Sequence, residues 1–129
     1  MDFRLIDQTR EWMKSQGILG DADIVSVAGA SKEIIDGTEG AKELLLKQIE
    51  LSGKLHSANQ VILLHHSDCG AYKASYTFLT PEEEKETQFR DMEKVSTIIK
   101  ENFPAMQVMK VWAQMKDGEG KEVEFIKVA

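Results

Sequence analysis

The stretch 61–72 constrains this chain more than any other part of the sequence, because a short apolar run leads directly into polar residues that can bind ligands. Residues 61–64 are continuous, apolar and β-branched at their start, a pattern typical of a strand covered on both faces by helices. His66 and Cys69 follow, and Gly70 ends the pattern. In open α/β proteins, residues at the carboxyl end of such a strand lie at the edge of the sheet where ligands bind. We therefore expect the functional site at this edge.

Segments with helical and strand-like patterns alternate along the rest of the chain. The polar, glycine-containing segment 116–121 predicts a hairpin near the C-terminus. The overall order predicts an α/β fold with a mostly parallel sheet flanked by helices and a C-terminal antiparallel hairpin. With 129 residues, the chain fits a single domain spanning 1–129. The predicted helices are 5–16, 41–52 and 82–102, and the predicted strands are 23–28, 61–66, 108–115 and 123–128.

Local signals predict where the helices begin and end. Gly17 and Gly53 follow the first two helical segments as C-terminal stops. Thr80 can cap the third helix, Pro81 can occupy its first position, and Glu83 can complete a capping box. The longest helix is therefore expected to begin next to this group.

The charge balance excludes several classes of partner. The chain has 16 basic and 22 acidic residues, a net charge of −6, and its basic residues are scattered rather than gathered into a stripe. This pattern argues against binding to nucleic acid or to an anionic membrane surface. No apolar run approaches the roughly 20 residues that a membrane-spanning helix needs, and the N-terminus lacks the apolar core of a signal peptide. We therefore expect a cytoplasmic protein.

His66 and Cys69 form an H-x-x-C pair that different chemistries could use. A neutral imidazole and a thiolate are both natural zinc ligands, but two ligands alone do not define a metal site. Without further context, such a pair is more often a buried cysteine beside a hydrogen-bonded histidine. Cys69 is the one cysteine of the chain, so it forms no internal disulfide, and a nucleophilic thiol is a third alternative. His65 alternates to the opposite face of the strand and is the poorer ligand.

Two charged residues near the N-terminus, Asp2 and Arg4, would by their spacing alone be solvated terminal charges. Considered together with His66 and Cys69, they give the sequence a recognisable order. The chain resembles the β-class carbonic anhydrases, whose pattern is C-x-D-x-R followed, after a strand and a helix, by H-x-x-C-G. The resemblance spans nearly the whole chain, since this family also ends in a long helix, a strand and a closing hairpin.

The resemblance implies an activity and a role for each of these residues. In this family zinc is held by Cys, His and Cys, and His66 and Cys69 match the second and third ligands. Zinc lowers the pKa of its bound water, and the hydroxide converts carbon dioxide to bicarbonate. Asp2 and Arg4 match a dyad in which the arginine holds the aspartate off the metal by a charge-assisted hydrogen bond. The resemblance also implies a homodimer or a higher homo-oligomer.

The chain departs from the family pattern at its start. The first Cys ligand would lie immediately before Met1, and the strand that leads into it, central in the family's sheet, is missing as well. Three explanations stay open: Met1 is internal to a longer natural chain, the protein is a shortened and inactive relative, or Asp2, the terminal amine or a partner subunit replaces the lost ligand. The alternative to hydration of carbon dioxide is therefore a catalytically inactive α/β protein that binds a partner or dimerises.

Overall fold

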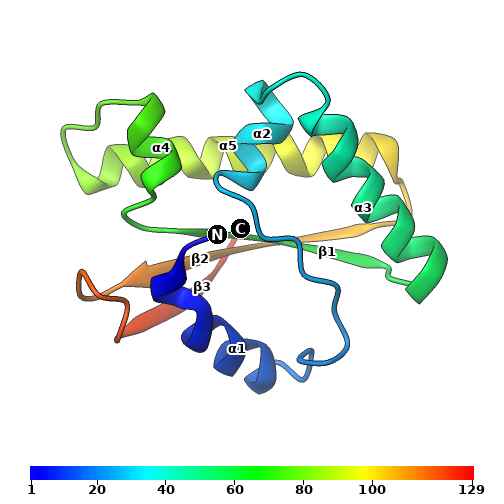
Figure 1. Cartoon of the computed structure of the whole chain (residues 1–129), viewed down its shortest axis with the longest axis horizontal. Helices are drawn as coiled ribbons and strands as arrows, with labels where there is room; N and C mark the ends of the chain where they lie inside the picture. Colours follow the sequence, from blue (N-terminus) through cyan, green and yellow to red (C-terminus); the bar gives the residue numbers. More distant parts are fainter.

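The computed structural model describes residues 1–129 and shows an α/β fold built on a three-stranded mixed sheet (Figure 1). Its strands are β1 (Gln60–His66), β2 (Gln107–Met115) and β3 (Val123–Val128), and they lie in this order across the sheet. β1 and β2 run parallel, whereas β2 and β3 run antiparallel. The predicted α/β class and C-terminal hairpin are confirmed. β1 pairs only with β2, so the other edge of β1 has no strand beside it.

Helices cover both faces of the sheet. Trp12 stacks on Phe125 of β3, with ring centroids 5.3 Å apart, and this contact attaches the first helix to its face. One side carries α2 (Ala30–Asp36), α3 (Ala41–His56), α4 (Gly70–Ser75) and α5 (Pro81–Asn102), and the other carries the 3-10 turn η1 (Phe3–Leu5) and α1 (Ile6–Ser15) (Figure 1). None of these helices is both long enough and apolar enough to span a membrane.

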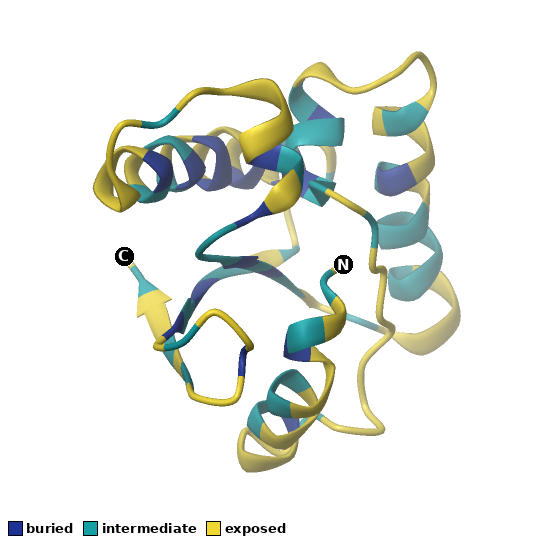
Figure 2. Ribbon diagram, turned by 60° about the vertical axis from the view of Figure 1, so that its left-hand side comes forward, coloured by how far each residue is buried: buried dark blue, intermediate teal, exposed yellow.

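The hydrophobic core lies between the sheet and the layer formed by α2, α3 and α5. The inner face of α5 is buried and its outer face is exposed (Figure 2), as expected for an amphipathic helix on a sheet. Because side chains alternate along a strand, His65 points into this layer and His66 points to the side of η1 and α1. The buried core residues are Ile34, Leu45, Leu63, Met92, Val95, Ile99 and Trp112.

The predicted ends of α1 and α5 are confirmed. Gly17 has φ +71°, and the N–H groups of residues 17 and 18 donate to carbonyl groups in the last turn of α1 at 3.0 Å, which is the Schellman pattern. At the start of α5, Thr80 Oγ1 accepts the Glu83 N–H at 3.2 Å, and Pro81 is the first helical residue. The Glu83 carboxylate accepts the N–H of Leu79 at 2.7 Å, one residue before the expected partner.

The predicted strand at 23–28 is wrong. Residues 23–27 have no regular secondary structure and no place in the sheet. A β-branched run favours an extended backbone, but a strand also needs a neighbouring backbone to pair with. Here the segment is attached at its two ends instead. Asp23 Oδ2 accepts from Ser52 Oγ at 2.6 Å and lies 2.7 Å from His56 Nδ1, both on α3, and the Val27 carbonyl oxygen accepts from the Met1 amino group at 2.8 Å.

Two further features differ from the sequence-based expectation. The short helices α2 and α4 lie where no helix is predicted, because seven and six residues are too few to produce a periodic apolar pattern. The stop predicted at Gly53 is also wrong, since α3 continues to His56. Gly53 lies against another segment: a Cβ there would be 3.1 Å from Met106 Cε. This glycine therefore allows close packing rather than ending the helix.

Candidate functional site

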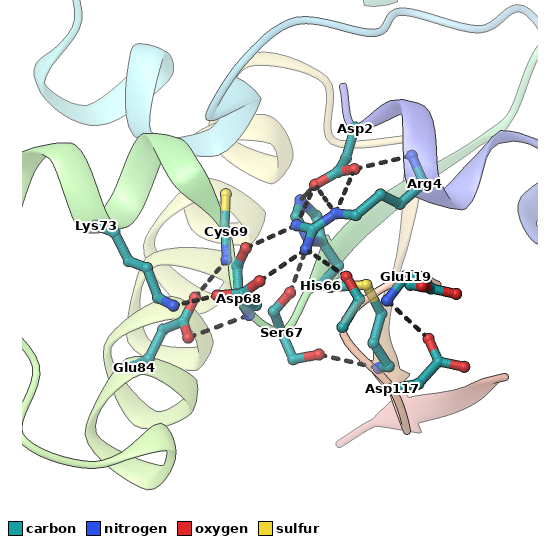
Figure 3. Close-up of polar contacts among 12 residues, drawn as sticks. Asp2, Arg4, His66, Ser67, Asp68, Cys69, Lys73, Glu84, Asp117 and Glu119 are labelled. Atoms are coloured by element: carbon teal, nitrogen blue, oxygen red, sulfur yellow. Dashed lines mark hydrogen bonds and ion pairs between the residues drawn. The ribbon is translucent and has the colours of Figure 1, made fainter. Parts of the chain in front are cut away.

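Asp2 and Arg4 are held together by the turn at the N-terminus of the chain (Figure 3). Asp2 is the N-cap of η1, and its Oδ1 accepts the Arg4 backbone N–H at 3.0 Å. The Arg4 side chain turns back onto the same carboxylate, with Nη2 2.7 Å from Oδ2 and Nε 3.0 Å from Oδ1. The hydrogen bond from the Arg4 side chain lowers the pKa of Asp2 to about 2. The carboxylate is therefore ionised at neutral pH.

His66 is the last residue of β1 and points toward this turn. Its Nε2 lies 4.0 Å from Asp2 Oδ2, and its Nδ1 lies 2.9 Å from the Ser67 carbonyl oxygen. A carbonyl only accepts, so Nδ1 carries a proton and donates to it, and this bond fixes the orientation of the ring. Burial lowers the pKa of His66, but contacts with Cys69, the Ser67 carbonyl and Asp2 together raise it above its ordinary value.

Cys69 lies at the N-terminus of α4 as its N-cap residue and is buried. Burial raises the pKa of the Cys69 thiol, whereas hydrogen bonds with His66 and with the N–H groups of Tyr72 and Ala71 lower it. The net effect is a pKa below the ordinary value. A helix N-terminus and a neighbouring imidazole thus favour the thiolate, which is the form that binds metals or attacks electrophiles.

Side chains of α5 hold the loop between His66 and Cys69. Glu84 Oε1 accepts the Cys69 N–H at 2.7 Å, and Glu84 Oε2 accepts the Asp68 N–H at 3.2 Å. One turn later, Gln88 Nε2 donates to Glu84 Oε1 and to the His66 carbonyl oxygen, both at 3.0 Å. Glu84 and Gln88 are 5% and 1% exposed. The loop backbone is therefore fixed by two buried side chains of one helix.

His65 belongs to this support and not to the site itself. Its Nδ1 lies 2.9 Å from Gln88 Oε1, and its Nε2 lies 2.6 Å from Ser31 Oγ on α2. Gln88 Oε1 only accepts, so Nδ1 carries the proton of the neutral ring and Nε2 accepts from the serine hydroxyl. Burial lowers the pKa of His65 to about 4. The expectation that this histidine faces away from His66 agrees with these contacts.

Arg4 also contacts a second carboxylate, that of Asp68. Arg4 Nη1 lies 2.7 Å from Asp68 Oδ2, and Arg4 Nη2 lies 3.0 Å from the Asp68 carbonyl oxygen. The Gly118 carbonyl, in the turn between β2 and β3, accepts from Nη1 at 3.3 Å. Lys73 binds the other carboxylate oxygen of Asp68. The hairpin turn and α4 therefore both contribute to the surroundings of Arg4 (Figure 3).

The structure brings the four predicted site residues together at the carboxyl end of β1. Asp2, Arg4 and His66 are linked by the distances given above, and the effect of Cys69 on the pKa of His66 indicates that these two side chains are close. No group of three or more His, Cys, Asp or Glu side chains lies close enough to hold a metal ion. The imidazole and thiolate suit zinc by type, but their number falls short of the three protein ligands that a zinc site needs.

Several residues at the site are not among those predicted from the sequence. Asp68 and Gly118 carry no signal of their own, because their role depends on a contact with Arg4 from the far end of the chain. Glu84 and Gln88 could have been found: they are spaced i, i+4 and share the buried face of α5 with Met92. A polar residue on an otherwise apolar stripe needs a buried partner.

The amino-acid sequence of this chain is similar to those of other proteins, and the similarity identifies its family. An uncharacterized protein of Rickettsia bellii is 40% identical over 113 residues, which cover 84% of this chain and 68% of that protein. An uncharacterized protein of Rickettsia conorii is 37% identical over 112 residues, covering 84% of this chain and 60% of that protein. The chain thus spans about two thirds of the length of these relatives. No solved structure matches it significantly. Residues 1–126 match the family described as "Putative carbonic anhydrase", and the chain belongs to this family.

Proposed function

We propose that this chain forms part of the active site of a zinc-dependent carbonic anhydrase that interconverts carbon dioxide and bicarbonate. The observation that carries the proposal is the meeting of the N-terminal turn with the end of β1, where Asp2 lies 4.0 Å from His66 Nε2 while Arg4 binds its carboxylate. Residues 2 and 66 are distant in the sequence, so their meeting is a property of the fold. The family match over residues 1–126 supports the same conclusion.

The zinc ligands of this chain would be His66 and Cys69. The His66 ring is oriented by the bond from Nδ1 to the Ser67 carbonyl, and its contact with Cys69 favours the thiolate. At least one further ligand is needed. Asp2 is not free to supply it while Arg4 binds both of its oxygens. We propose that the further ligand lies outside residues 1–129, and the greater length of the Rickettsia relatives supports this.

Asp2 and Arg4 would orient groups in the site rather than hold the metal. The ionised Asp2 carboxylate can accept a hydrogen bond from a polar hydrogen beside His66, and the fixed guanidinium sets the direction of its oxygens. This role needs a carboxylate whose two oxygens face the N–H groups of a guanidinium, and the 3-10 turn holds Asp2 and Arg4 in this arrangement. It does not depend on how many ligands the metal has.

Zinc content and carbon dioxide hydration test the proposal in protein extended upstream of Met1. We expect about one zinc per chain and measurable hydration. His66→Ala and Cys69→Ser should weaken zinc binding by more than about 100-fold, since even outer partners of metal ligands contribute 10- to 100-fold. His56→Ala, at an exposed histidine of α3, is the matched control and should bind zinc normally. An extended protein with neither metal nor hydration would refute the proposal.

The lowered pKa of Cys69 beside the His66 imidazole also favours a second candidate, a thiol enzyme that uses Cys69 as nucleophile. This candidate predicts rapid alkylation of Cys69 at neutral pH that added zinc does not suppress. The carbonic anhydrase proposal predicts that zinc protects Cys69 in the extended protein, because a coordinated thiolate is no longer free to react. His66→Gln should slow alkylation only if the imidazole activates the thiol.

Three further properties are proposed together with the activity. We propose that residues 1–129 fold as one domain, that the protein acts in the cytoplasm, and that it is a homodimer or a higher homo-oligomer. A single cooperative unfolding transition, cell fractionation and analytical ultracentrifugation test these points in turn. If the extended protein assembles but neither binds zinc nor hydrates carbon dioxide, a non-catalytic binding or dimerising protein becomes the better description.

A further inference from the structure

The N-terminal helical segment, η1 followed by α1, contacts the C-terminal hairpin along one of its faces (Figure 1). Positions 4, 8 and 12 are four residues apart, so they lie on the same side of the segment. The contacts are those of Arg4 Nη1 with the Gly118 carbonyl oxygen at 3.3 Å, of Gln8 Nε2 with the Lys121 carbonyl oxygen at 3.4 Å, and of the Trp12 ring with the Phe125 ring, at 5.3 Å between centroids. The hairpin therefore runs alongside the segment that begins with Asp2 and Arg4.

The contact between Gly120 and Arg4 is made by backbone atoms. Gly120 is buried and has φ +73°. A Cβ at this position would be 2.4 Å from the Arg4 carbonyl oxygen and 3.0 Å from the Arg4 carbonyl carbon. No rotation of a side chain can relieve such an overlap. Because non-bonded atoms ordinarily lie about 3.5 Å apart, the two turns would have to separate by about 1 Å to accept a larger residue.

The hairpin turn is held by its own hydrogen bonds. The Asp117 carboxylate accepts the N–H groups of residues 119, 121 and 122 at 2.9 to 3.1 Å. At the base of the turn, the Lys116 N–H donates to the Glu122 carbonyl oxygen at 2.8 Å. The turn also joins two paired strands, so the sheet fixes its position. A larger residue at position 120 would therefore displace the N-terminal turn rather than the hairpin.

Displacement of Arg4 would also displace Asp2. The Arg4 N–H donates to Asp2 Oδ1 at 3.0 Å, and the Leu5 N–H donates to the Asp2 carbonyl oxygen at 3.1 Å, so the turn moves as one unit. His66 would not follow, because it lies in β1 and its carbonyl oxygen accepts from Gln88 of α5 at 3.0 Å. The separation of 4.0 Å between Asp2 Oδ2 and His66 Nε2 thus depends on the contact with the hairpin.

We propose that Gly120 is a positioning residue of the candidate site. Its lack of a side chain lets the hairpin turn and the N-terminal turn meet backbone to backbone, and this contact sets how close Asp2 lies to His66. The catalytic consequence rests on the proposed function, whereas the geometric dependence is a property of the folded chain. The C-terminal hairpin thereby helps to determine the geometry at the end of β1.

Nuclear magnetic resonance of the metal-free chain tests the inference through the Arg4 Nε–H and the ring protons of His66. In Gly120→Ala we expect both sets of resonances to shift, because the guanidinium and the Asp2 carboxylate move relative to the imidazole. Gly20→Ala is the matched control: Gly20 also has a left-handed φ, +87°, but a Cβ there would have no atom within 4 Å. In this control the resonances should coincide with those of the native chain. A Gly120 that matters only for stability would lower the denaturation midpoint and leave these resonances in place.

A second variant keeps the test decisive if Gly120→Ala does not fold. Asp117→Ala removes the acceptor of three N–H groups in the hairpin turn but adds no atom against Arg4. The turn then presents Gly120 less rigidly, so the same resonances should move away from their native positions. Glu119→Ala, at an exposed residue of the same turn, is the control and should leave them unchanged.

Activity of the protein extended upstream of Met1 gives an independent measurement. Gly120→Ala should lower kcat/KM for carbon dioxide hydration by about 100-fold, as expected for a misplacement of about 1 Å. Its zinc content should stay at the native value, because neither His66 nor Cys69 lies against Gly120. Gly20→Ala should keep the native kcat/KM.

The inference is overturned if the Arg4 and His66 resonances of folded Gly120→Ala match those of Gly20→Ala. Should Gly120→Ala not fold, agreement between the resonances of Asp117→Ala and those of Glu119→Ala overturns it instead. Failure of the native extended protein to bind zinc or to hydrate carbon dioxide refutes the proposed function alone, and the comparison of resonances still decides the geometric dependence.

Discussion

The loop from His66 to Cys69 is held from two sides, and the two sides differ in burial. On the α5 side, Glu84 and Gln88 are 5% and 1% exposed and bind the loop backbone directly. On the N-terminal side, Arg4 binds the Asp68 carbonyl oxygen and the Asp2 and Asp68 carboxylates. The Arg4, Asp2 and Asp68 side chains are 19%, 12% and 47% exposed. The α5 side is therefore fully buried, and the N-terminal side is partly exposed to water.

This difference teaches which contacts can change at low cost. No buried side-chain nitrogen or oxygen of the chain lacks a hydrogen-bond partner, so loss of any member of the α5 side leaves a buried polar group unpaired. On the N-terminal side, water can replace a lost partner most readily at Asp68, whose side chain is 47% exposed. We therefore expect the α5 side to determine stability and the N-terminal side to determine chemistry.

The largest effect is expected from Glu84→Ala. The substitution leaves the N–H groups of Asp68 and Cys69 without their acceptor, so we expect a loss of about 3 kcal/mol in the free energy of unfolding. Urea denaturation measures it. Glu86→Ala, at an exposed glutamate of the same helix, should change stability by less than about 0.5 kcal/mol. A loss below about 1 kcal/mol for Glu84→Ala would remove the contrast between the two sides.

The next effect is a pH dependence that arises from His65. Its pKa is about 4 in the folded protein, against an ordinary value of 6.5. Between these values the unfolded chain binds a proton that the folded chain does not, so stability falls as the pH is lowered from 6.5 toward 4. The full loss is about 3 kcal/mol. Above pH 6.5 this residue contributes no pH dependence.

Denaturation of the native chain and of His65→Gln at several pH values isolates this contribution. The variant should be less stable at pH 7, because Ser31 and Gln88 lose a ring that fits between them. Its stability should, however, vary less between pH 6.5 and 4. Equal slopes for the two proteins in this window would show that His65 is not held neutral by burial.

A smaller effect is expected from Arg4→Met. The Arg4 and Asp2 side chains are 19% and 12% exposed, between a surface pair and a fully buried one, so the substitution should lower the free energy of unfolding by about 2 kcal/mol. The same urea titration measures it, with Arg10→Met on α1 as the control. A loss as large as that of Glu84→Ala would show that the N-terminal side contributes as much to stability as the α5 side.

The smallest effect on stability is expected from Asp23→Ala. Asp23 is exposed and connects segment 23–27 to Ser52 and His56, so global unfolding should change little. Limited proteolysis should instead become faster within this segment, because it has no strand partner to hold it. Asp21→Ala, two residues earlier, is the control. Unchanged cleavage would show that the segment is restrained by other contacts.

The sequence predicts regular elements well where the pattern is long or the cap is specific. The helix that begins at Thr80 and Pro81, and the strands on either side of the turn 116–121, are found within one or two residues of their predicted bounds. The prediction fails at 23–28, because a strand depends on a partner that local composition does not supply. Gly53 shows the same limit of prediction from local sequence. A glycine stands there because Met106, from another segment, packs against it, and not because the helix ends.

The candidate site divides in the same way. Asp2, Arg4, His66 and Cys69 were predicted from the resemblance to the β-class carbonic anhydrases, since their spacing alone favoured ordinary roles, and the structure brings them together. Asp68 was not recognisable, because an aspartate in a loop has many ordinary roles and its partner lies 64 positions away.

By itself, the sequence determined the family, the α/β class and the residue types available at the carboxyl end of β1, since these follow from local pattern and motif spacing. Only the tertiary structure decided how the loop from His66 to Cys69 is held. On the α5 side it is bound by the buried Glu84 and Gln88, and on the N-terminal side by Arg4, which lies between the carboxylates of Asp2 and Asp68. The physical reason is that the strength of a polar contact depends on burial and on the completeness of its partners, and both are set by segments that meet only when the chain has folded.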